Sequence, residues 1–160
     1  MKTVGIVMLF GLCTMIGMQL GAKKTARLFT VRTLRKELQL FSERITSGRG
    51  TLMEIASEKD GLLSEMLGRY LDALGKGDTE PEAAGKAAGK LKAESTEHAG
   101  MLMFFTGLST GSRMDLIGRA NALSPTLGRA ENEAEAEAKQ ARVLRVSGML
   151  IGAGVAILLI

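Results

Sequence analysis

Residues 85–90, GKAAGK, are the first stretch whose residue types and spacing suggest chemistry. A phosphate-binding loop needs Gly-x-x-x-x-Gly-Lys followed by Ser or Thr, so that backbone amides cradle the phosphates and the hydroxyl binds magnesium. Here one residue is missing between the two glycines, and Leu91 follows Lys90. We therefore expect a helix of small residues with an exposed lysine face.

His98, the one histidine, lies four residues after Glu94. On one helix face, a carboxylate and an imidazole can shuttle a proton or, with further ligands, bind a metal. No second histidine is available, and the one cysteine, Cys13, lies in an apolar stretch where it acts as a small hydrophobe. A solvated surface pair is the favoured interpretation. We predict no catalytic residue, no cofactor and no metal site.

Acidic residues alternate with Asn or Ala late in the chain. On a helix, residues two apart point in different directions, so these glutamates spread around the surface and form no paired-carboxylate site. A solvated face is the favoured interpretation, and a docking surface for a basic partner is the alternative. The residues are Glu131, Glu133, Glu135 and Glu137.

The charges of the 160-residue chain are confined to its middle. Lys2 is the only charged residue in residues 1–22, and residues 146–160 carry none. The other 20 Lys and Arg and all 17 Asp and Glu lie in residues 23–145, which therefore carry a net charge of +3. This small excess and the few aromatic residues argue against a nucleic-acid reader, and a single Cys excludes a disulfide-stapled domain.

The two apolar ends predict membrane helices. The 20 uncharged residues from Thr3 to Ala22 span about 30 Å as a helix, which matches the hydrocarbon core of a bilayer. A cleaved signal peptide is the alternative, but the positive charge that follows at once favours an uncleaved anchor. The 15 residues 146–160 span about 22 Å, which indicates a short or shallow second membrane helix, with a buried core helix as the alternative.

Basic residues flank both apolar stretches. Because positive charge tends to stay on the cytoplasmic side, we expect a membrane hairpin whose middle domain, residues 23–145, is cytosolic. Each apolar stretch also contains two glycines four residues apart, which let membrane helices approach closely, although glycine is common in such helices. The glycines are Gly17, Gly21, Gly148 and Gly152, and the membrane-proximal basic collar comprises Lys23, Lys24, Arg27, Arg142 and Arg145.

The middle of the chain predicts an all-α, antiparallel helical bundle, since strand signals are scarce. Apolar residues recur at spacings of three and four over residues 28–45, and Gly48 then marks a turn. Capping patterns at Thr51 and Thr79 begin two further helices. The second of these is rich in alanine, and we expect it to pack weakly. Pro125 lies inside the longest apolar stripe, which keeps its phase on both sides and so indicates a kink and not an end.

Three motifs carry a family resemblance that covers nearly the whole chain. They are Arg32, Leu34-Arg35 and Leu38; then Ile45, Gly48, Leu52 and Glu54; and finally residues 147–152 with the apolar run 155–160. In these motifs the chain resembles the stage III sporulation protein AB family of endospore-forming bacteria. It departs from the family pattern at three positions of the second motif and at residues 107–109.

The resemblance implies a non-enzymatic, membrane-anchored assembly component of the channel between mother cell and forespore. The protein would lie in the mother-cell membrane that faces the forespore. Its cytosolic domain would be similar to the cytoplasmic modules of the inner-membrane platform proteins of type II secretion and type IV pilus systems.

The implied partners are a secretion-type ATPase and other channel proteins, with a homo-oligomer left open. Neither nucleic acid nor a small-molecule substrate is implied. On this interpretation Arg32 and Arg35, together with the four glutamates at residues 131–137, are candidate docking residues.

Two other classes of protein compete with this interpretation. A sensory four-helix module between two membrane helices would need an extracytoplasmic middle, which the basic flanks oppose, and a signalling segment after Ile160. A small membrane-tethered enzyme would need a catalytic site, and the residue pattern offers none.

Overall fold

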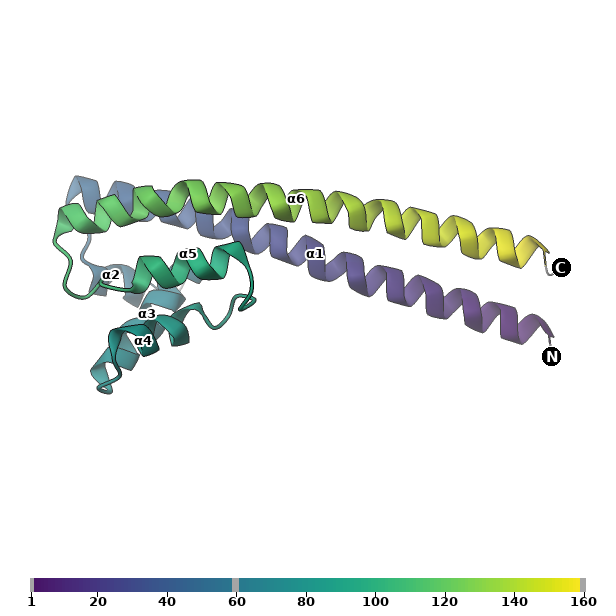
Figure 1. Ribbon diagram of the computed structural model, residues 1–160, viewed down its shortest axis with the longest axis horizontal. Coiled ribbons are helices and arrows are strands. Elements are labelled where there is room, and N and C mark those ends of the chain that lie inside the picture. Colours follow the sequence, from purple (N-terminus) through teal and green to yellow (C-terminus); the bar gives the residue numbers. More distant parts are fainter. Residues whose placement is uncertain (1, 59–60, 159–160) are drawn as a thin grey trace. The chain divides into compact units, whose positions relative to one another are not determined.

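The computed structural model describes residues 2–58 and 61–158, and most of the described side chains lie in residues 22–58, 61–143 and 146–147. This part of the chain contains helices and no strand, which confirms the all-α class (Figure 1). The helices are α1 (Lys2–Ser47), α2 (Leu52–Ser57), α3 (Leu62–Gly75), α4 (Glu80–Ala88), α5 (Thr96–Phe105) and α6 (Arg113–Leu158).

The chain divides into two compact units. We call residues 31–131 the bundle unit, and residues 1–30 with 132–160 the hairpin unit. Helices α1 and α6 each contribute to both units without a break in the helix. The predicted domain limits, after residue 22 and before residue 146, therefore fall inside continuous helices.

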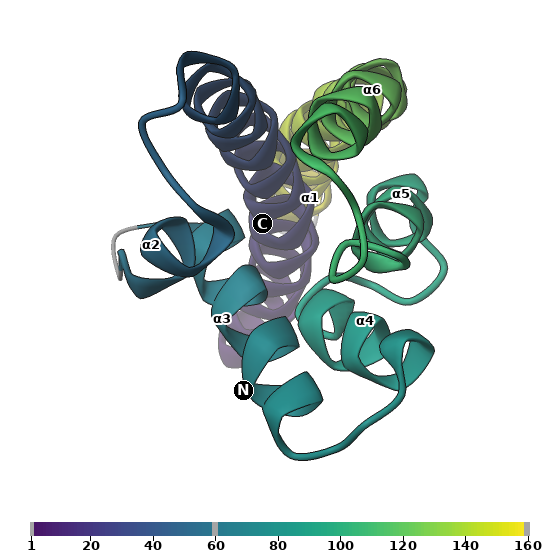
Figure 2. The same ribbon diagram turned by 90° about the vertical axis from the view of Figure 1, so that its left-hand side faces the viewer.

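In the bundle unit, helices α2 to α5 lie beside α1 and α6 (Figure 2). The core of this unit contains a buried aromatic centre. Phe41 of α1 meets Phe104 of α5 edge to face, with ring centroids 5.8 Å apart. Tyr70 of α3 lies 5.3 Å from Phe105. Such ring pairs stabilise a core beyond the apolar area they bury. The apolar stripe predicted on the first helix is confirmed, because Val31, Leu34, Leu38, Phe41 and Ile45 are all at most 3% exposed.

Helix α4 is tightly packed, so the prediction of weak packing is wrong. Its four alanines are 0% exposed, and the helix packs against α3 and α5. A helix without bulky side chains can approach its neighbours closely, so small residues fill the interface as completely as large ones would. The buried residues are Ala83, Ala84, Ala87 and Ala88.

Local signals set most helix ends as expected. Helix α1 stops at Gly48, whose φ of +71° favours a residue without a β-carbon. Thr51 then caps α2, since its hydroxyl accepts from the Glu54 amide at 3.3 Å and its own amide donates to the Glu54 carboxylate at 2.7 Å. Helix α6 continues through Pro125, as the unbroken stripe predicts.

One helix start depends on a residue far away in the sequence. The carboxylate of Glu37 in α1 accepts hydrogen bonds from the amides of Leu62 at 3.1 Å and Leu63 at 2.6 Å. These are two of the amides that the first turn of α3 leaves without a helical partner. Glu37 thereby anchors the N-terminus of α3 to α1.

The hairpin unit pairs the first part of α1 with the last part of α6 in antiparallel order (Figure 1). Within the residues that the structure describes, no helix is both long enough and apolar enough to cross a membrane. The two predicted membrane helices are thus not confirmed. The packing glycines Gly17, Gly21, Gly148 and Gly152 lie outside the described side chains.

Substitution of Gly100 tests how closely α5 approaches α6. A β-carbon at Gly100 would lie 2.8 Å from Cδ1 of Leu123 and 3.0 Å from Cγ2 of Thr126. We expect Gly100→Val to destabilise the fold by about 1–3 kcal/mol, the usual cost of overpacking a core. As the control, Gly85→Ala in α4 meets nothing within 4 Å and should gain up to roughly 1 kcal/mol in helix propensity. Urea unfolding followed by circular dichroism measures both, and equal midpoints would contradict the close approach.

Candidate partner-binding surface

In the hairpin unit, Arg27 joins α1 to α6. Its guanidinium lies 2.7 Å from the Glu137 carboxylate and 3.6 Å from that of Glu133. Glu133 and Glu137 are one helical turn apart, so both reach the same arginine. Arg27 is therefore paired within the chain, although we predicted it as part of a basic collar.

The pairing of Arg27 fixes the register of the two helices. Arg27 lies level with residues 133–137, so residues before it in α1 lie level with residues after them in α6. Lys23 and Lys24 consequently lie at about the same height as Lys139 and Arg142, of which all but Lys24 are exposed. The predicted collar residues thus come together from both helices, while the side chain of Arg145 lies outside those described.

In the bundle unit, Glu131 of α6 binds two arginines of α1. The Nε of Arg32 donates to one carboxylate oxygen at 2.9 Å, and Nη1 of Arg35 donates to the other at 2.8 Å. The hydrogen bond from Arg35, and after it the one from Arg32, holds the pKa of Glu131 below its usual value of 4.5. The side chain of Glu131 is only 18% exposed. Three candidate docking residues therefore bind one another.

Glu135 makes contacts separate from those of the other glutamates. Its carboxylate lies 3.2 Å from the Nζ of Lys139, one helical turn later. The four glutamates thus have three sets of partners, because Glu133 and Glu137 share Arg27 while Glu131 and Glu135 each contact other residues. Glu133, Glu135 and Glu137 keep 49%, 41% and 39% of their side chains exposed. That these residues dock a partner stays a prediction.

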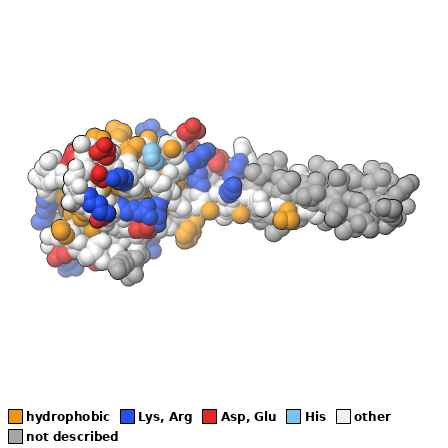
Figure 3. All heavy atoms as spheres, turned by 90° about the horizontal axis from the view of Figure 1, so that it is seen from below, with side chains coloured by type: hydrophobic (Ala, Val, Ile, Leu, Met, Phe, Trp, Pro, Cys, Tyr) orange, Lys and Arg blue, Asp and Glu red, His pale blue; other side chains and the backbone are white. Residues whose placement is uncertain are grey.

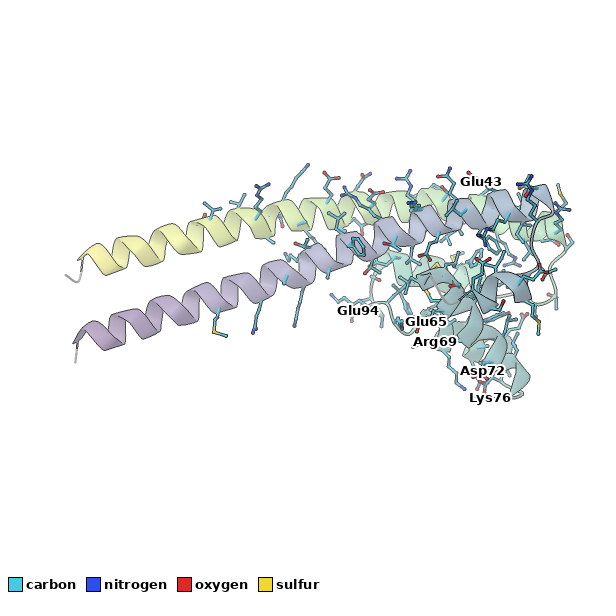
Figure 4. All side chains as sticks on the ribbon, turned by 180° about the vertical axis from the view of Figure 1, so that it is seen from behind. Glu43, Glu65, Arg69, Asp72, Lys76 and Glu94 are labelled. Carbon is cyan, nitrogen blue, oxygen red and sulfur yellow. The ribbon has the colours of Figure 1, made fainter. Side chains whose placement is uncertain are left out.

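The outer face of α3 carries charges of both signs (Figure 4). Glu65 pairs with Arg69 at 3.0 Å and with Lys90, and Asp72 pairs with Lys76 at 2.6 Å. The hydrogen bond from Lys90 is the main reason why the pKa of Glu65 lies below its usual value. On the face shown in Figure 3, acidic and basic side chains of the bundle unit are likewise interspersed. Such a surface attracts no partner by net charge alone.

The GKAAGK stretch forms no phosphate loop. Residues 85–88 belong to α4, and Lys86 and Lys90 are exposed. Lys86 pairs with Asp78, and Lys90 pairs with Glu65. The predicted helix with an exposed lysine is confirmed for residues 85–88, while Lys90 lies in the turn that follows α4.

Glu94 and His98 do not share a helix face, contrary to our expectation. Helix α5 begins at Thr96, and Glu94 lies in the turn before it. The cause is Ser95, whose hydroxyl accepts from the His98 amide at 3.2 Å and so starts the helix after Glu94. Among the residues that the structure describes, no group of acidic, histidine or cysteine side chains is placed to hold a metal ion.

Sequence reasoning missed a carboxylate that joins α4 to the connection before α6. Glu80 accepts from the Gly107 amide at 3.1 Å and from the Ser109 hydroxyl. The Ser109 hydroxyl is the main reason why the pKa of Glu80 is lowered. Beneath this bridge, burial raises the pKa of Tyr70. Because the partners are 27 and 29 residues apart, no local pattern could have revealed the bridge.

Neutralising Glu131 tests its pair with the two arginines. The pKa of Glu131 is lower in the folded state than in the unfolded state. The contribution of this carboxylate to the free energy of unfolding is therefore complete above pH 4.5, and it is lost as the pH falls through the pKa of the folded state. We expect Glu131→Gln to lose roughly 1 kcal/mol at pH 7, within the range of partly exposed pairs. The deficit should shrink as the pH is lowered from 7 to 3.

Urea unfolding at the two pH values measures this effect. The matched control is Glu94→Gln, which removes the charge of an exposed carboxylate in a turn and should leave the midpoint unchanged at either pH. A deficit in Glu131→Gln that is no smaller at pH 3 than at pH 7 would mean that the ion pairs are not its source.

Comparisons with known proteins give one match. No curated protein and no solved structure matches the chain. The family model described as stage III sporulation protein AB matches residues 2–160, and that family is not a known family of enzymes. Because the match covers almost every residue, the chain belongs to the stage III sporulation protein AB family, which implies a role in sporulation.

Proposed function

We propose that the protein is a non-enzymatic, membrane-anchored assembly component of the channel between mother cell and forespore. Its bundle unit lies in the mother-cell cytosol and docks a secretion-type ATPase. The observation that carries this proposal is the register of the hairpin unit, in which basic residues of two helices meet at one level. In the sequence, these basic residues are next to the two uncharged stretches, residues 3–22 and 146–160.

The membrane part of the proposal rests on charge and length. Residues 3–22 are uncharged, and they lie in a helix that continues without a break to Ser47. Residues 146–160 are uncharged as well. Lys23 and Lys24 follow the first stretch, and Arg142 precedes the second. Positive charge beside a membrane helix tends to stay in the cytoplasm, so the middle of the chain is expected there. The Arg27 pairs explain how both helices present this charge together.

The docking part rests on the exposed portions of the paired charges. Arg32 and Arg35 keep 51% and 52% of their side chains exposed while they bind Glu131. Exposed ion pairs contribute little to stability, so they can rearrange to accept a partner at small cost.

Cysteine labelling tests the topology. In a Cys13→Ser background, we expect Glu94→Cys to react with a membrane-impermeant maleimide only after the cell membrane is permeabilised. Thr3→Cys should react in intact cells, because residue 3 lies at the outer end of the first predicted membrane helix. Labelling of Glu94→Cys in intact cells would place the bundle unit outside and remove the proposal.

A charge swap tests docking without disturbing the fold. The triple variant Arg32→Glu, Arg35→Glu and Glu131→Arg keeps opposite charges within hydrogen-bonding reach and reverses what a partner meets. We expect its affinity for the purified ATPase to fall at least about tenfold, which corresponds to 1.4 kcal/mol. Biolayer interferometry with the full chain in nanodiscs measures the change.

The matched control is another swap in the bundle unit. Asp72→Lys with Lys76→Asp exchanges the charges of an ion pair on α3 and should leave ATPase binding unchanged. If the triple swap binds like the unaltered chain, residues 32, 35 and 131 play no part in docking. If the unaltered chain does not bind either, the ATPase is not the partner.

A further inference from the structure

A hollow of about 710 Å³ opens at one end of the bundle unit. It lies between the last turn of α1, the connection to α2, and the first turns of α2 and α6. Figure 2 looks at this end of the bundle. Ile45, in the last turn of α1, is 14 residues from Val31, or about 21 Å along the helix. The hollow is therefore at the opposite end of the bundle unit from residues 31 and 131, where the chain enters and leaves it.

Arg113 of α6 forms a fixed wall of this hollow. Its Nε donates to the carbonyl of Ile45 at 2.6 Å, and its Nη2 donates to the carbonyl of Thr46 at 2.6 Å. The guanidinium thereby caps the C-terminus of α1, where carbonyls lack helical partners. A β-carbon at Gly48 would lie 3.1 Å from Nη2, so glycine provides the space for Arg113.

The opposite wall is fixed by the start of α2. The Glu54 carboxylate binds the amide of Thr51 at 2.7 Å, so its negative charge is already directed to the backbone. The two walls are held by hydrogen bonds before any ligand arrives, and such preorganisation lowers the cost of binding.

Arg49 supplies a cation for a ligand. It lines the hollow and is exposed, and among the residues that the structure describes none forms a hydrogen bond or ion pair with its guanidinium. The lining contains two guanidiniums and one carboxylate, and that carboxylate is engaged. An incoming carboxylate would find in Arg49 a planar donor suited to bidentate binding.

Two exposed methionines are next in sequence to residues that line the hollow. Met53 follows the lining residue Leu52 and is 74% exposed, while Met114 follows Arg113 and is 75% exposed. Methionine is flexible and polarisable, so it adapts to apolar side chains of different shapes and is common on surfaces that bind peptides. The end of the bundle thus offers a cation beside adaptable apolar groups.

We infer that this hollow binds an acidic and apolar peptide segment of the cytosolic partner, with a carboxylate on Arg49 and an apolar side chain against Met53 and Met114. The inference rests on the proposed function for the partner's identity, and it adds a second contact region distinct from the one at Arg32, Arg35 and Glu131. Charge complementarity selects an acidic segment over a basic one.

A short peptide tests the chemistry of the hollow directly. Acetyl-Glu-Leu-Leu-amide is titrated into the full chain in micelles while the amide resonances of Gly48 and Gly50 are recorded by NMR. We expect binding at least about ten times tighter than that of acetyl-Lys-Leu-Leu-amide, and loss of that preference in Arg49→Glu. Equal binding of the two peptides, or no shift at either glycine, overturns the inference.

The purified ATPase tests the link to the partner. Arg49→Glu should weaken its binding at least about tenfold, and Met53→Ala with Met114→Ala should weaken it severalfold. The matched control is Lys92→Glu, which makes the same charge change at an exposed position of the bundle unit outside the hollow.

The two proposals fail in different ways. Full ATPase binding by Arg49→Glu overturns the inference and leaves the proposed function intact. If the unaltered chain binds no ATPase, the proposed function fails, and the peptide titration still decides whether the hollow recognises acidic segments.

Discussion

Four buried aromatic rings hold the bundle unit together, and its other contacts depend on them. Phe41, Phe104, Phe105 and Tyr70 are each at most 2% exposed and join α1, α3 and α5. Rings of this size contribute much of the apolar area in so small a core. Once they fix α3 and α5 against α1, Glu37 reaches the start of α3. The position of α5 likewise brings Gly107 and Ser109 within reach of Glu80 on α4.

Periodicity and capping predicted most of the helices because both are local. The helix predicted to begin after Thr51 is confirmed at residues 52–57, since Thr51 and Glu54 are close enough in sequence to be recognised as one capping pattern. The packing of the alanine-rich helix α4 was predicted wrongly, because small side chains bury as completely as large ones where helices approach closely. Glu94 was expected on the same helix as His98, but Ser95, a residue type that favours helix starts, begins α5 after Glu94.

The contacts of the candidate surface were harder to predict than the fold. Arg32, Arg35 and Glu131 were predicted as docking residues, and that role stays a prediction. Their pairing with one another depends on the register of α1 against α6, because the paired residues are 96 and 99 positions apart in the sequence. The same holds for Arg113, which caps α1 across 67 and 68 residues. The composition of a segment reveals which side chains are charged, and only the packing of helices decides which charges meet.

The order in which the helices occur also governs when the bundle can close. Helix α1 is synthesised first, yet the buried face of α1 in the bundle is completed by α6, which is synthesised last. Leu116, Leu123 and Leu127 of α6 are buried in the finished bundle. Until they have left the ribosome, the part of α1 that packs against α6 stays exposed as apolar surface. Helices α2 to α5 can collapse on α1 earlier through local contacts. Final closure of the bundle therefore waits for nearly the whole chain, and a protein truncated before α6 would be a target for chaperones and proteases.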